Sequence, residues 1–157
     1  MRLSRKHPEL GVDAERIAVE VLSEVSIEVT AAEVEAALVD IPLEALGARV
    51  GHVRGRGYVD ETEAAWELVE GAIAPFRSDL ERRGTLGHLE AATTLVVGIV
   101  AGIYRVREPD MGTVVAYAGE ETTAELAGGV VELADRLGVI IPDDAGVAHW
   151  PAWIDLV

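Results

Sequence analysis

The sequence predicts an all-α fold, a single-domain bundle of five to six helices built around a buried central helix. Three observations predict this fold. The stretch from Ala91 to Tyr104 contains no charged residue, and its flanks keep helical periodicity. Elsewhere, apolar residues recur at intervals of three and four, which is typical of amphipathic helices. Helix start and stop signals, such as capping boxes and terminal glycines, bracket several of these stripes.

The first two helices are predicted before Asp40. We expect residues 1–12 to be a flexible basic terminus, because they contain Arg2, Arg5 and Lys6 but no apolar run typical of a secretory signal. Apolar residues follow one face from 13 to 25, so this segment is predicted to be an amphipathic helix. The capping-box pattern at 30–33 predicts a second helix from there to about residue 39.

A short helix and a long helix are predicted next. Pro42 ends the preceding helix, because the residue before a proline resists the α conformation, and it suits the start of a short helix over 43–48. The long helix begins near Asp60. Its apolar stripe consists of Trp66, Val69, Ile73, Phe76 and Leu80. Pro75 lies inside this stripe and removes one backbone hydrogen bond, so we expect a kink or a break there.

The central helix is predicted over about residues 86–106. Its 14 uncharged residues are too few to cross a hydrocarbon layer of about 30 Å, which needs roughly 20 residues. We therefore expect it to be buried in the core of a soluble bundle. One side carries large aliphatic residues and the other carries Thr94, Gly98 and Gly102, a spacing that lets a neighbouring helix approach closely. The short connection at 83–85 predicts that the preceding helix packs against it in an antiparallel hairpin.

The C-terminal third is predicted to contain one long helix and a docked tail. Residues 113–118 suit a strand or a helical turn, and we favour the helix. A helix is predicted over 120–137, with Gly138 as its stop signal. Residues 138–157 are expected to be an irregular apolar tail that packs on the bundle through Trp150 and Trp153. In the alternative, these two tryptophans are exposed anchors for a protein partner.

Composition restricts the classes of function. The net charge of −15 and the pI near 4.5 argue against general affinity for nucleic acid or for anionic lipid, since both are bound by neutralising phosphates. We expect no membrane association and consider nucleic acid an improbable partner. The chain has no cysteine, which excludes disulfides, thiolate metal ligands and a thiol nucleophile. A cytoplasmic location is the default expectation.

Glu63, Glu67 and Glu70 are candidate metal ligands. They lie on one side of the predicted long helix, where carboxylates can hold Mg²⁺ or Mn²⁺ against a second acidic helix. All-helical nucleotide pyrophosphohydrolases build their sites in this way. The ordinary alternative is that these glutamates are solvated at the flank of an amphipathic helix.

The segment from Arg49 to Tyr58 is the one place where the charge reverses. Its candidate contact residues for an anion or an acidic partner are Arg49, His52, Arg54 and Arg56. They lie among three glycines, so a flexible loop is the ordinary alternative. The two preceding helices and this loop also resemble a helix-turn-helix followed by a wing, which gives nucleic-acid binding as a weaker alternative.

Our leading functional hypothesis is a small acidic cytoplasmic protein without a cofactor that works by protein–protein contact, as a homo-oligomer or an adaptor. The alternative is a metal-dependent hydrolase of nucleotides or other phosphoesters, in which Arg54 and Arg56 hold the substrate phosphate. The hydrolase requires the acidic helix and the arginine loop to converge on a cleft, whereas the interaction module does not.

Overall fold

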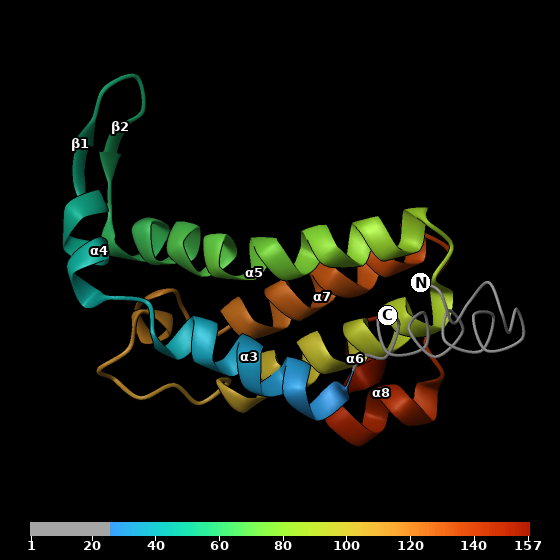
Figure 1. Cartoon of the computed structure of the whole chain (residues 1–157). Coiled ribbons are helices and arrows are strands. Elements are labelled where there is room, and N and C mark those ends of the chain that lie inside the picture. Colours follow the sequence, from blue (N-terminus) through green and yellow to red (C-terminus); the bar gives the residue numbers. More distant parts are fainter. Residues whose placement is uncertain (1–25) are drawn as a thin grey trace, which may run out of the picture.

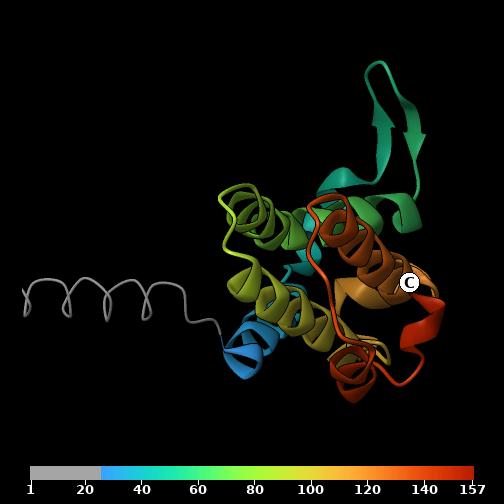
Figure 2. The ribbon, with the colours of Figure 1, turned by 90° about the vertical axis from the view of Figure 1, so that its right-hand side faces the viewer.

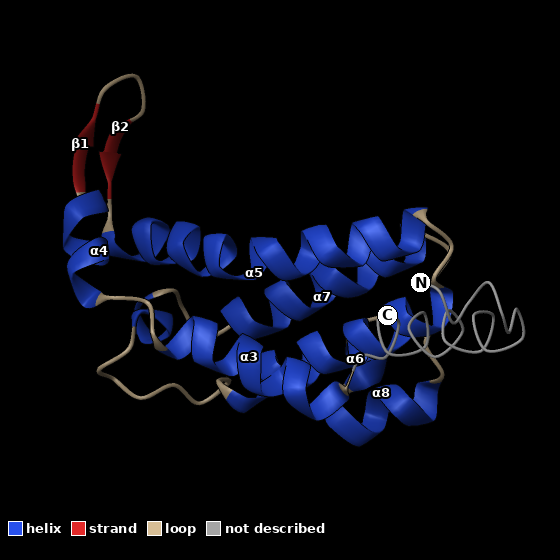
Figure 3. Cartoon of the chain, viewed as in Figure 1, coloured by secondary structure: helices blue, strands red, loops and turns tan. Residues whose placement is uncertain are grey.

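A computed structural model describes residues 26–157, and the helix predicted over 13–25 and the basic terminus over 1–12 lie outside the described residues. The described part is an all-α bundle with a small β-hairpin (Figures 1 and 3). Its α-helices are α3 (Ile27–Val39), α4 (Leu43–Arg49), α5 (Glu61–Thr85), α6 (Leu89–Arg105), α7 (Thr122–Arg136) and α8 (Asp143–His149). The strands are β1 (Gly51–Val53) and β2 (Gly57–Val59), and two 3₁₀ helices are η1 (Val114–Tyr117) and η2 (Trp153–Asp155). The predicted fold class is confirmed.

Helix α3 begins one turn earlier than the capping-box pattern predicted. Ser26 is the N-cap, and its hydroxyl accepts a hydrogen bond from the Val29 backbone N–H at 3.3 Å. Thr30 therefore lies inside the helix, where it is 5% exposed. The predicted short helix after Pro42 is confirmed as α4, with Pro42 at its N-cap.

The small-residue face of α6 packs directly on α3, as the spacing predicted. A Cβ atom added at Gly98 would lie 2.6 Å from Cβ of Thr30. One added at Gly102 would lie 2.7 Å from the carbonyl oxygen of Ala31. Because any side chain at these positions would collide with α3, the glycines set the distance between the two helices.

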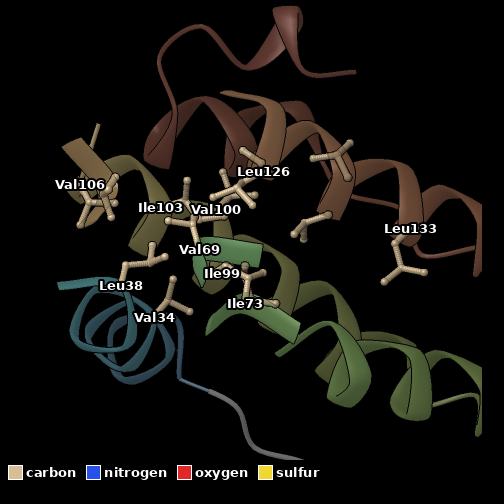
Figure 4. Packing of buried hydrophobic residues seen from close by; sticks show 14 of the residues in the cluster. Val34, Leu38, Val69, Ile73, Ile99, Val100, Ile103, Val106, Leu126 and Leu133 are labelled. Carbon is tan, nitrogen blue, oxygen red and sulfur yellow. The ribbon is translucent and has the colours of Figure 1, made fainter. Parts of the chain in front are cut away.

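The core is formed by aliphatic side chains from all four long helices. On α6 the buried residues run from Ala91 to Ile103, with only Thr93 and Thr94 less buried. Figure 4 shows side chains of α3, α5, α6 and α7 meeting in this core, among them Leu38, Ile73, Ile99 and Leu126. Within residues 26–157, no helix combines the length and the apolar character that crossing a bilayer requires.

Helix α5 continues through Pro75, so of the two predicted outcomes, a kink or a break, the break does not occur. Val69 and Ile73 before the proline and Leu80 after it are all fully buried. Both halves of the helix are therefore packed against the same core. This burial offsets the loss of the backbone hydrogen bond that proline cannot donate. The turn to α6 is at Leu86–His88 rather than at 83–85. After this turn α6 runs back antiparallel to α5 (Figure 1), as predicted.

The segment at 113–118 is helical, as we favoured, and contains η1. Helix α7 is also confirmed, and it ends where Gly138 predicted. Gly138 has φ +74°. Its N–H donates to the Asp135 carbonyl at 3.0 Å, and the Val139 N–H donates to the Ala134 carbonyl at 2.9 Å. This is the hydrogen-bond pattern of a glycine helix stop.

The C-terminal tail is more regular than predicted, because it contains α8 and η2. Pro142 opens α8 in the same way as Pro42 opens α4. The predicted docking of the tail is confirmed, since Trp150 and Trp153 are 7% and 2% exposed. The Trp150 ring lies 5.2 Å from that of Tyr104, and the Trp153 ring lies directly on Gly146.

Candidate functional site

The segment predicted as a glycine-rich loop is a β-hairpin, which we call the hairpin arm (residues 51–59). β1 and β2 pair in antiparallel register, with His52 opposite Tyr58. The turn is closed by a hydrogen bond from the Arg56 N–H to the Val53 carbonyl at 3.0 Å. Gly55 and Gly57 have φ of +85° and +86°, so the glycines shape the turn rather than leave the segment without structure.

The hairpin arm projects away from the helical bundle. In Figures 1 and 2 it extends beyond the end of α5. Every residue from 52 to 58 is exposed. Tyr58 is 61% exposed and Val53 is 36% exposed. Only Val59, at the base, is buried in the core cluster, so the outer part of the arm contributes little to the stability of the bundle.

One face of the hairpin arm carries two aromatic rings in contact. The rings of His52 and Tyr58 are 5.3 Å apart between centroids and meet edge to face, at an interplanar angle of 75°. The pair is cross-strand, so hairpin formation itself positions the rings. Arg54 lies in the turn that joins the two strands. Tyrosine and arginine are the residue types that protein interfaces favour over the rest of the surface.

Ion pairs join α5 to Arg56, in the turn of the hairpin arm, and to Arg49, at the end of α4. Arg56 donates to Glu63 at 2.8 Å and also pairs with Glu67. Arg49 donates to Glu67 at 3.1 Å. The hydrogen bond from Arg56 is the main cause that lowers the pKa of Glu67, and Glu67 in turn raises the pKa of Arg56. Ion pairs at a solvent-accessible surface contribute little to stability, so we infer that these pairs mainly fix the direction of the arm.

The four residues predicted to contact an anion or a partner therefore divide into two pairs. Arg49 and Arg56 are bound to carboxylates of α5. Arg54 and His52 are exposed on the outer part of the arm, and no ion pair within the described residues involves them. The structure does not gather the four into one anion pocket, because two of them are already neutralised.

The three predicted metal ligands are not gathered either. Glu63 lines one surface groove, whereas Glu67 and Glu70 line another, together with Arg49 and Arg77. Over residues 26–157 there is no group of three or more histidine, aspartate or glutamate side chains that could hold a metal ion. The acidic helix and the basic segment do converge, but their charges pair with one another, so this geometry lends no support to the metal hypothesis.

A second feature of the site, which the sequence analysis missed, is a groove of about 530 Å³ between the N-terminal ends of α5 and α7. We call it the acidic groove. Its carboxylates come from Asp60, Glu63, Glu120, Glu121 and Glu125. The half-buried ring of Trp66 also lines it. Among the ion pairs of the described residues, only Glu63 of this set takes part, so the groove presents uncompensated negative charge beside an aromatic surface.

The tail tryptophans do not fit the hypothesis of exposed partner anchors, because both are buried within this chain. Trp153 belongs to the core cluster and lines a groove of about 600 Å³ with apolar residues of α7 and of the tail. Its indole Nε1 is buried and has no hydrogen-bond acceptor among the described residues. The tail therefore completes the bundle.

No protein-family model, curated protein or solved structure matches this chain significantly. Its function has to be inferred from its own residues. The hairpin arm and the acidic groove beside it are the features whose composition the helical bundle does not require.

Proposed function

We propose that this protein is a protein–protein interaction module whose hairpin arm binds an acidic surface of a partner. The proposal rests on one observation. The seven consecutive residues 52–58 are exposed on an ordered hairpin that projects from the bundle. Exposed aromatic residues on a projecting element contribute little to folding, and they are typical of contact surfaces.

The charge of the hairpin arm supports an acidic partner. The chain carries −15 overall, yet residues 49–59 contain three arginines and no carboxylate. Arg49 and Arg56 pair with α5, so Arg54 presents the positive charge of the arm. Complementary charge steers association and selects between partners, so an acidic protein surface suits the arm. The same net charge disfavours nucleic acid, even though α3, α4 and the hairpin follow one another in the order of a winged helix-turn-helix.

The backbone of the hairpin arm offers a second mode of contact. The sheet has two strands, so each strand has an outer edge that no other strand of the described chain covers. Such edges accept an added strand from a partner. Each strand is three residues long, so an added strand gains few backbone hydrogen bonds. Side chains such as Tyr58 and Arg54 therefore supply most of the specificity.

Site-specific photo-cross-linking tests this proposal. A photoreactive phenylalanine analogue replaces Tyr58 in the full chain, and a matched control carries the analogue at Val147 of α8, which is 49% exposed. We expect irradiation in cells to give protein adducts from position 58 that Arg54→Glu reduces. Adducts from position 58 that are no more abundant than those from position 147 would contradict the proposal.

A further inference from the structure

The surface that the hairpin arm binds is, we infer, the acidic groove of a second copy of this chain, an inference that rests on the proposed function. The protein would then form a dimer in which each copy inserts its arm between α5 and α7 of the other. Three features of the described residues support it: matched chemistry, an unfilled groove, and the position of the arm beside the groove.

The chemistry of the acidic groove complements that of the hairpin arm in two respects. Asp60, Glu120, Glu121 and Glu125 supply negative charge for Arg54. Trp66 supplies an aromatic surface for Tyr58 and His52. Carboxylates alone would suit any cation, whereas carboxylates together with an indole ring favour a partner that offers both an arginine and an aromatic ring.

The arm of the same chain does not fill this groove. No residue from 51 to 59 lines it, and the arm points away from the bundle (Figure 2). Within one chain the arm contacts the groove wall through the side chain of Arg56, a turn residue that pairs with Glu63. Arg54 and Tyr58 take no part in this pair and are exposed to an approaching copy.

The position of the arm beside the groove suits a closed dimer. Val59 ends β2 at the arm's base, and the next residue, Asp60, lines the groove. Because donor and acceptor surfaces adjoin, a single two-fold axis can bring each arm over the other copy's groove. Both contacts form at once and no further copy can add, so the assembly stops at two.

A charge exchange tests this inference. Arg54→Glu reverses the arm and Glu121→Arg reverses the groove. Each variant alone would place like charges together in both contacts, so we expect its homodimer association constant to fall at least about tenfold. An equimolar mixture of the two variants restores opposite charges in both contacts, and we expect it to form a heterodimer. Sedimentation velocity and native mass spectrometry on the full chain measure these species.

Matched controls are available at the far end of α5. Arg82→Glu and Glu81→Arg make the same two charge changes at exposed positions outside the arm and the acidic groove. We expect both to dimerise as the unmodified chain does. Circular dichroism establishes that each variant remains helical, so a loss of association is not a loss of folding.

The outcomes separate this inference from the proposed function. Weakened homodimers together with heterodimer formation support the inference. A dimer that Arg54→Glu leaves unchanged overturns it, because another surface then holds the copies together. A monomer at every concentration tested also overturns it. In that case, cross-linking from position 58 to a different protein would leave the proposed function standing, whereas absence of any adduct would reject both.

Discussion

Replacing Gly102 with alanine tests the close packing of α3 on α6. The new Cβ atom would lie 2.6 Å from Cβ of Val34 and 2.7 Å from the carbonyl oxygen of Ala31. Ordinary van der Waals contact for a Cβ atom begins at 3.4 Å. Because one of the obstructing atoms belongs to the backbone, a rotamer change cannot relieve the clash. Helix α3 itself has to move away from α6.

The expected cost follows from two opposing effects. Overpacking a core typically costs about 1–3 kcal/mol. Alanine is favoured over glycine inside a helix by about 0.8–1.0 kcal/mol. Gly129→Ala in α7 is the matched control, since nothing lies within 4 Å of the atom it adds. The helix preference cancels between the two variants, so Gly102→Ala should be less stable than Gly129→Ala by about 1–3 kcal/mol.

Urea unfolding followed by circular dichroism measures this difference by linear extrapolation. In thermal unfolding, each kcal/mol corresponds to a shift in Tm of about 2–4 °C for a chain of this size. Gly129→Ala should unfold at a higher temperature than the unmodified chain, and Gly102→Ala at a lower one than Gly129→Ala. Equal stability of the two alanine variants would refute the close packing of α3 on α6.

Three further predictions concern the tail, the ion pairs of Glu67 and the metal hypothesis. Trp153→Ala should lower the free energy of unfolding by about 3–5 kcal/mol, the usual range for truncating a buried aromatic residue. A chemical denaturation midpoint near that of the unmodified chain would show that the tail is not part of the core. The lowered pKa of Glu67 means that its ion pairs stabilise the fold above the ordinary glutamate pKa of 4.5 and stop doing so as pH falls through the lower folded value. Glu67→Gln should therefore lower Tm at neutral pH, and this deficit should shrink below pH 4.5; a deficit that grows on acidification would contradict the ion pairing with Arg56. Millimolar Mg²⁺ or Mn²⁺ should leave Tm unchanged. A metal-induced rise in Tm that Glu63→Gln abolishes would support the hydrolase hypothesis instead.

The sequence predicted those parts of the fold that depend on regular spacing along one helix. The row of Gly98 and Gly102 indicated a close neighbour, and the structure places α3 there. Gly138 ended its helix as predicted, because a glycine stop is a local signal. The identity of the neighbour could not be predicted, since helical periodicity shows which face is buried and not what covers it.

The predictions that were wrong or missing concern features that a longer-range contact decides. The start of α3 shifted to Ser26 because Thr30 is buried against α6. The strands of the hairpin arm are too short for an alternating pattern, and their glycines suggested a loop. The acidic groove was missed because Asp60 and Glu121 are far apart in the sequence and come together only when α5 packs beside α7.

Cross-linking from position 58, followed by identification of the joined peptides by mass spectrometry, tests most directly whether the hairpin arm is a binding surface. The proposed function predicts protein adducts that depend on Arg54. If a second copy is the partner, the joined peptide should come from the N-terminal end of α5 or α7, near Trp66 or Glu121. The proposed function is contradicted if adducts from position 58 are no more abundant than those from position 147, both in the unmodified chain and in Arg54→Glu.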